Sequence, residues 1–90
     1  MTAGPAEDAR NRVKRLHLRA WRRGTRELDL VLGRFADAEL GRMDGDRLDL
    51  FEALLAVEDP LLADWIAGRA RPPDRFAEMV AALGRFPGGI

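Results

Sequence analysis

Apolar residues recur at three- and four-residue intervals along most of the chain, the spacing that places side chains on one face of an α-helix. The first such series lies between residues 9 and 22 and consists of Val13, Leu16 and Ala20. We see no segment with the two-residue alternation of a half-buried strand. The pattern therefore predicts helices throughout.

The stretch after this first helix contains signals for a helix end and a helix start. Gly24 stands where a glycine ends a helix, and Arg22 and Arg23 fall in the last turn, where the helix dipole favours cations. Thr25 is the predicted N-cap of the next helix, with Glu27 in its first turn. We expect this second helix to run to about residue 38 and to bury Leu28, Val31, Leu32 and Phe35.

A third helix is predicted after the glycine-containing stretch ELGRMDGD interrupts the pattern. Asp46 can cap it, and it should extend from about Arg47 to Val57. Two rows of apolar residues follow this helix, so we expect it to lie at the centre of the fold. The rows are Leu48, Phe51 and Leu55, and Leu50, Leu54 and Val57.

Two further helices complete the predicted set. Asp59 followed by Pro60 is a strong helix start, an N-cap with proline at the first helical position, and Gly68 should end that helix. Its apolar residues are Leu61, Leu62, Trp65 and Ile66. After the sequence Arg71-Pro72-Pro73, the last helix presents Phe76, Met79, Val80 and Leu83.

Short connections between five amphipathic helices predict an all-α fold, a compact five-helix bundle. The length of 90 residues suits one domain, which we place at residues 9–85. Residues 1–8 and 86–90 are expected to be flexible ends. We find no internal repeat.

Composition excludes several kinds of chemistry. The chain has no cysteine and a single histidine, His17, which leaves no thiolate nucleophile and disfavours a histidine metal site or a Ser-His-Asp triad. Asp44, Asp46 and Asp49 lack the ligand pattern of an EF-hand, so we interpret them as caps and surface charge. We predict no metal site, and we expect His17 to pack beside the core. Trp21 fits a core or an interface position equally well.

The charges are unevenly distributed although their formal sum is zero. Residues 1–26 carry eight basic and two acidic side chains, whereas residues 27–64 carry three basic and eleven acidic ones. Such a layout can orient a partner, although solvated helix faces explain it as well. It also leaves open a small helical nucleic-acid-binding protein that contacts phosphates through the basic first helix. That helix segment offers Arg10, Arg12, Lys14, Arg15, Arg19, Arg22 and Arg23.

No apolar run approaches the roughly 18 residues that span a bilayer. The first residues also lack the apolar core of a secretory signal. We therefore expect a cytoplasmic protein without direct membrane insertion.

The segment RRGTRELDL, residues 22–30, concentrates charge around a glycine. A helix end followed by a helix start explains Gly24 and Thr25. It does not explain why Arg22, Arg23 and Arg26 crowd one corner, where their repulsion must be offset by acidic neighbours or by a partner.

Arg23, Gly24 and Glu27 resemble the RGxxE motif of the SdhE (YgfY) family, to which the mitochondrial succinate dehydrogenase assembly factor also belongs. The downstream stretch LDLFEALLAVEDPLLADWIAG is similar to that family too, and the resemblance covers about residues 13–68. It implies a small five-helix bundle, which agrees with the helices predicted above. It also implies a FAD assembly factor (a chaperone) that binds the flavoprotein subunit of succinate dehydrogenase or fumarate reductase and promotes its covalent flavinylation.

The same resemblance assigns the partner-binding surface. It implies this role for Arg23, Gly24 and Glu27, and proximity extends it to Arg22, Arg26 and Asp29. These three neighbours complete the six candidate residues. We expect Arg23 to pair with an acidic or carbonyl group of the flavoprotein, and Glu27 either to orient Arg23 or to meet a basic group across the interface. Both side chains should be exposed at this corner.

Chemistry favours a helper over an enzyme. The nucleophilic histidine and the groups that stabilise charge on the flavin can all lie within the flavoprotein, so FAD is the cofactor of the partner and none need be stably bound here. We therefore expect a protein that is not an enzyme, is monomeric or weakly associating, and binds no nucleic acid.

Overall fold

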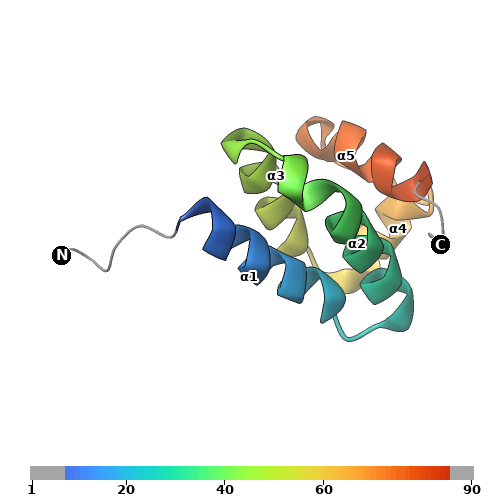
Figure 1. The fold of residues 1–90 in the computed structure, drawn as a ribbon. Coiled ribbons are helices and arrows are strands. Elements are labelled where there is room, and N and C mark those ends of the chain that lie inside the picture. The colour runs from blue at the N-terminus through green and yellow to red at the C-terminus, as the bar shows by residue number, and fades with distance from the viewer. Residues whose placement is uncertain (1–7, 86–90) are drawn as a thin grey trace.

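The computed structural model describes residues 8–85, and in that range the chain forms five α-helices, one short 3₁₀ helix and no strand (Figure 1). The helices are α1 (Ala9–Trp21), α2 (Arg26–Glu39), α3 (Gly45–Leu55), α4 (Asp59–Ile66) and α5 (Asp74–Arg85), with the 3₁₀ helix η1 (Leu40–Arg42) after α2. This confirms the predicted all-α fold of five helices. The flexibility expected of residues 1–8 and 86–90 concerns, apart from Asp8, residues outside the described range.

The helices are arranged around α2 and α3. α1 packs along α2 and also contacts α3, whereas α5 packs on α2, α3 and α4. Figure 1 shows α1 and α5 on opposite sides of the molecule, with α2 and α3 between them. The turn that joins α1 to α2 lies at one end of this arrangement, and the start of α4 lies near it.

A single cluster of apolar side chains forms the core, and no polar or charged residue of the described range is buried in it. Phe51 of α3 is completely buried and contacts Phe35 of α2, with 5.8 Å between the ring centroids. Trp65 of α4 stacks in the same way on Phe76 of α5, also at 5.8 Å. Each large apolar side chain buried in this way stabilises the fold by roughly 1.5–3 kcal/mol. The core position predicted for Trp65 is therefore correct. α3 buries Leu48, Phe51, Leu54 and Leu55 as expected, whereas Leu50 and Val57 of the second predicted row are only partly buried.

Both predicted limits of α3 need correction. α3 is capped by Asp44, whose carboxylate accepts the Arg47 amide at 2.9 Å, and Asp46 lies in the first helical turn instead. The cap lies two residues earlier than predicted because Gly45 is included in the helix. α3 also ends at Leu55 rather than at Val57. α1 begins at Ala9, as predicted, after the N-cap Asp8, whose carboxylate accepts the Asn11 amide at 2.8 Å.

α4 begins one residue earlier than its sequence signal suggested. Glu58 is the N-cap and makes no side-chain cap hydrogen bond, while Asp59 is the first helical residue. Gly68, at φ 80°, ends α4 as predicted. Leu61, predicted as part of its apolar face, is 45% exposed. The apolar residues expected for α5 are all buried.

Candidate functional site at the turn between α1 and α2

The turn between α1 and α2 depends on a glycine. α1 ends at the C-cap Arg22, whose amide donates to the Arg19 carbonyl, and Gly24 follows two residues later at φ 99°. Residues other than glycine rarely adopt this backbone conformation. A Cβ atom at Gly24 would meet nothing within 4 Å, so the conformation alone selects glycine here.

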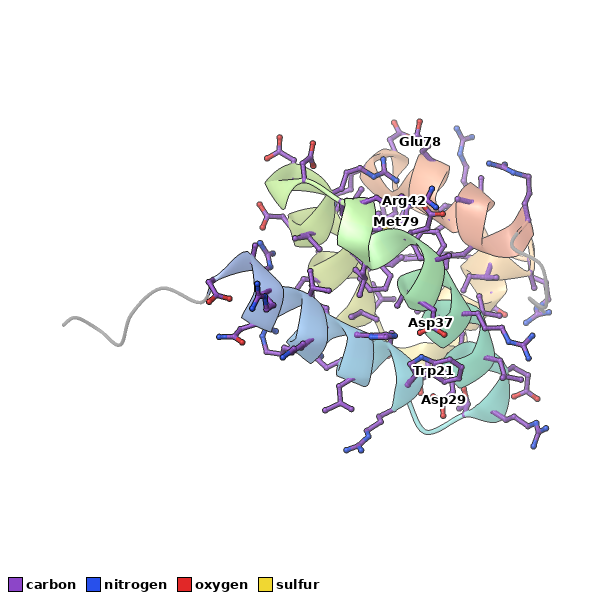
Figure 2. The ribbon with its side chains drawn as sticks, in the orientation of Figure 1. Trp21, Asp29, Asp37, Arg42, Glu78 and Met79 are labelled. Carbon is purple, nitrogen blue, oxygen red and sulfur yellow. The ribbon has the colours of Figure 1, made fainter. Side chains whose placement is uncertain are left out.

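Asp29, in the first turn of α2, holds this turn from the other side. Its carboxylate Oδ1 accepts the Arg23 amide at 2.7 Å and the Gly24 amide at 3.2 Å (Figure 2 shows Asp29 beside the turn). The turn amides are thus satisfied by a side chain of the following helix, which ties the two helices together. This explains Asp29 structurally, and its contact with a partner stays a prediction.

The side chain of Arg23 points inward and is only 11% exposed. Its Nε and Nη2 donate to Oδ1 of Asp59 at 3.0 and 2.6 Å. Nη2 also donates to the Val57 carbonyl at 2.6 Å, and Nη1 donates to the Leu55 carbonyl. A guanidinium offers five donors in a fixed planar arrangement, which suits it to join three acceptors of one chain segment.

These contacts correct the expectation of an exposed arginine–glutamate pair at this corner. Arg23 is occupied by groups of its own chain, and we find no contact between it and Glu27 among the described residues. The correction extends to Asp59, which was predicted as a helix cap and instead binds Arg23. Local spacing could not reveal this pair because its members are thirty-six residues apart.

Three charged side chains of the corner are exposed: Arg22, Arg26 and Glu27. None has a hydrogen bond or an ion pair with another residue of the described part of the chain. Arg22 ends α1, and Arg26 and Glu27 begin α2, so the three lie on either side of the glycine turn. The repulsion that the sequence suggested is partly offset from inside, because Asp59 neutralises Arg23.

A hollow of about 330 Å³ lies beside this corner, between the starts of α2 and α4. Apolar groups contribute most of its surface, and Glu27 and Asp59 supply carboxylates. The lining residues are Thr25, Glu27, Leu28, Asp59, Pro60, Ala63 and Arg69. Thr25 is the N-cap of α2 by its backbone, as predicted. Its hydroxyl nevertheless makes no cap hydrogen bond and has no partner within the described residues, although it is buried.

A second polar cluster joins α1 to α2 further from the turn. Oδ1 of Asp37 accepts the Trp21 indole Nε1–H at 3.1 Å and shares a hydrogen bond with Nε2 of His17. The hydrogen bond to His17, followed by that from Trp21, lowers the pKa of Asp37 below its ordinary value. Figure 2 shows Trp21 and Asp37 together on one side of the molecule. His17 is 43% exposed, so it lies at the surface of this cluster and not in the core.

The basic side chains of α1 do not form one continuous free surface. Arg12 binds Asp49 at 2.6 Å and Glu52 at 3.0 Å, and Arg15 binds Glu52 at 2.9 Å. Together with Arg23, three of the seven cations available to a nucleic acid are therefore bound within the chain. This weakens the alternative that the protein binds nucleic acid through this helix.

The structure adds two observations on other classes of site. Within residues 8–85, no group of three or more His, Asp or Glu side chains is placed to hold a metal ion. The described helices are all too short or too polar to cross a membrane.

Comparison with known proteins gives a consistent result. The family described as the flavinator of succinate dehydrogenase (Sdh5) matches residues 14–87. The FAD assembly factor SdhE of Acetobacter pasteurianus is 40% identical over 76 residues, which cover 83% of this chain and 70% of the relative. The protein of the same name from Legionella pneumophila is 39% identical over 73 residues, or 81% and 92% of the two chains. The mitochondrial succinate dehydrogenase assembly factor 2 of Arabidopsis thaliana is 34% identical over 68 residues, which cover 76% of this chain and 36% of that one.

Proposed function

This chain belongs to the Sdh5 family of flavinators of succinate dehydrogenase, and we propose that it assists covalent FAD attachment by binding the flavoprotein subunit at the corner between α1 and α2. In this proposal the protein is a helper and not an enzyme. FAD is the cofactor of its partner. The client is the flavoprotein of succinate dehydrogenase or of fumarate reductase, and the helper acts in the cytoplasm as a monomer.

One observation supports the corner above other surfaces. Arg22, Arg26 and Glu27 are exposed and unpaired within the described chain, while the backbone that carries them is held by Asp29 and by the internal contacts of Arg23. Charges that are displayed on a firmly held backbone lose little conformational freedom when they bind, which favours recognition. The corner thus offers both signs of charge in a fixed arrangement.

Each candidate residue has a physical role in this proposal. Glu27 meets a basic group of the flavoprotein, and Arg22 and Arg26 meet acidic or carbonyl groups. Gly24 provides the turn and allows close backbone approach. Arg23 and Asp29 act mainly by holding the turn.

A helper with these contacts promotes the reaction by population shift. It binds the arrangement of the flavoprotein that is competent for flavin attachment more tightly than the other arrangements, and so raises its population. The reacting groups then belong to the flavoprotein and its FAD. The residues of this chain bind and orient the partner and need not touch the reacting atoms.

The experiment is to produce the flavoprotein subunit with and without this chain and to measure flavin fluorescence of the denatured subunit. We expect more covalent flavin when the chain is present, and equal amounts would overturn the proposal. Glu27→Gln should reduce the gain. Asp46→Asn is the matched control, because Asp46 is also an exposed acidic residue in the first turn of a helix, α3 instead of α2.

The alternative function is checked in parallel by a gel shift with duplex DNA at physiological ionic strength. A salt-sensitive shift without any effect on covalent flavin would favour the nucleic-acid-binding protein.

A further inference from the structure

We propose that Asp59 is a positioning residue for the partner-binding corner, acting through Arg23 although the two are thirty-six residues apart. This inference rests on the proposed function. It adds to the corner a residue at the start of α4, where the sequence indicated only a helix start.

The side chain of Arg23 makes its contacts at the junction between α3 and α4. Leu55 is the last residue of α3, and helix ends leave carbonyl groups without partners inside the helix. Arg23 donates to the carbonyls of Leu55 and Val57, at the end where the helix dipole attracts a cation. The guanidinium thus caps α3 from a distant part of the chain.

The carboxylate of Asp59 binds the Arg23 guanidinium. It receives two of the four hydrogen bonds of the Arg23 side chain, and it is itself only 30% exposed. If this carboxylate is removed, the guanidinium keeps only the two neutral carbonyls as acceptors. Its nearly buried positive charge then has no counter-ion. Asp59 is therefore the group that fixes the guanidinium in its place.

Arg23 also connects this junction to the corner. Arg23 is bonded through its amide to Asp29 in the first turn of α2, and through its side chain to the junction before α4. One residue thereby sets the position of the α2 start relative to the α4 start. Glu27 lies in that same first turn of α2, so its placement depends on both connections.

The Arg23–Asp59 ion pair also affects the charge around Glu27. Glu27 and Asp59 line the same hollow, together with Arg69, whose Nε donates to Asp64 at 2.9 Å. Because Arg23 neutralises Asp59, Glu27 is the carboxylate of this hollow that is left without an ion pair in the described chain. Loss of the Arg23–Asp59 pair would alter both the geometry and the potential around Glu27.

The test compares Asp59→Asn with Glu78→Gln, which removes an exposed ion pair to Arg47 whose members do not line the hollow. We expect Asp59→Asn to weaken binding to the flavoprotein about tenfold, the effect of a change of 1.4 kcal/mol. Glu78→Gln should stay within about twofold, as is usual for exposed pairs. Circular dichroism and thermal unfolding establish that both variants are folded under the binding conditions.

A double-mutant cycle separates positioning from direct contact. If Asp59 acts through Arg23, Asp59→Asn should have no further effect on affinity in a protein that already carries Arg23→Gln. Additive losses would overturn the inference, because they would mean that Asp59 contributes independently of Arg23.

Amide hydrogen exchange gives a readout that needs no partner and covers the case in which Arg23→Gln does not fold. Exchange at the Arg23 and Gly24 amides, which donate to Asp29, should accelerate at least about fivefold in Asp59→Asn and remain unchanged in Glu78→Gln. Unchanged exchange and unchanged affinity in Asp59→Asn would overturn this inference alone. Failure of the unmodified protein to bind the flavoprotein would instead overturn the proposed function.

Discussion

The indole ring of Trp21 lies directly over the α-carbon of Gly33. A Cβ atom at Gly33 would be well inside van der Waals contact with three carbon atoms of the ring, and the indole N–H reaches on to Asp37. Gly33 is buried in the middle of α2, where glycine is about 1 kcal/mol less favourable than alanine. The packing of Trp21 against this position gives a physical reason for a glycine here. It also places Trp21 between the two helices and not in the central core.

Gly33→Ala should destabilise the fold by about 1–3 kcal/mol, because the methyl group displaces a large ring that has little room to move. The displaced indole should also lose its hydrogen bond to Asp37 and change its fluorescence emission. Chemical denaturation and tryptophan fluorescence measure the two effects. Gly45→Ala in α3 is the control, because a Cβ there meets nothing within 4 Å. Equal stability of the two variants would contradict the packing described for Trp21.

Gly24→Ala should destabilise by a different mechanism. Space around Gly24 is open, so the expected loss of about 1–3 kcal/mol comes from the positive φ alone. Gly41 has equally open surroundings without a positive φ, so Gly41→Ala should be neutral or slightly stabilising. Thermal unfolding of the pair tests this. If Gly24→Ala and Glu27→Ala both fold normally and keep full flavinylation-promoting activity, the assignment of the corner fails.

Thr25→Val should leave stability unchanged or raise it by up to about 1 kcal/mol. Replacing a threonine N-cap usually costs about 1 kcal/mol, because a cap hydrogen bond is lost. Here the buried hydroxyl makes no such bond, so a methyl group in its place removes an unsatisfied polar group. Urea denaturation distinguishes the outcomes. A clear loss of stability would show that the hydroxyl has a partner in solution.

The stability of the protein should fall as the pH drops below about 4.5, partly because of Glu52. Its hydrogen bond from Arg15, followed by that from Arg12, lowers the pKa of this carboxyl from its ordinary value of 4.5 in the folded protein. The unfolded chain then binds the proton more readily, so the stabilisation is present above pH 4.5 and is lost as the pH falls through the lower folded pKa. The hydrogen bonds to Asp37 also lower the pKa of its carboxyl, so their contribution to stability is likewise lost as the pH falls.

Glu52→Gln tests this dependence. The variant should be less stable than the original protein at pH 7, and the difference should shrink as the pH is lowered towards 2. Denaturation curves at several pH values measure it. Glu78→Gln, which removes an exposed pair with Arg47, should change stability at pH 7 by no more than a few tenths of a kcal/mol. A constant difference between Glu52→Gln and the original protein over the whole range would contradict the prediction.

The helices could be predicted from the sequence because their signals are local. The three- and four-residue spacing identified residues such as Phe35 and Phe51, which meet in the core. Helix limits were less accurate where two candidate caps lie close together, as with Asp44 and Asp46 before α3. In such places one added helical residue decides which carboxylate reaches the free amides.

The contacts of Arg23 with residues 55–59 could not be predicted, because they join segments that are distant in the sequence. Nothing near Asp59 indicates that its carboxylate turns to Arg23, since the following proline already explains an acidic residue there. The clusters around Asp37 and Gly33 are of the same kind. For the packing of Trp21 on Gly33, the one local signal was a glycine in the middle of a helical pattern.

The reach of Arg23 to residues 55–59 has a consequence for inhibitor design. A synthetic peptide that copies residues 22–30 contains every residue of the motif. It lacks the hydrogen-bond acceptors in residues 55–59 that hold Arg23 in place. Such a peptide should be a poor competitor for the flavoprotein, because it would have to order itself at the moment of binding. A useful mimic would have to include the stretch that carries Asp59, or replace it with a covalent brace.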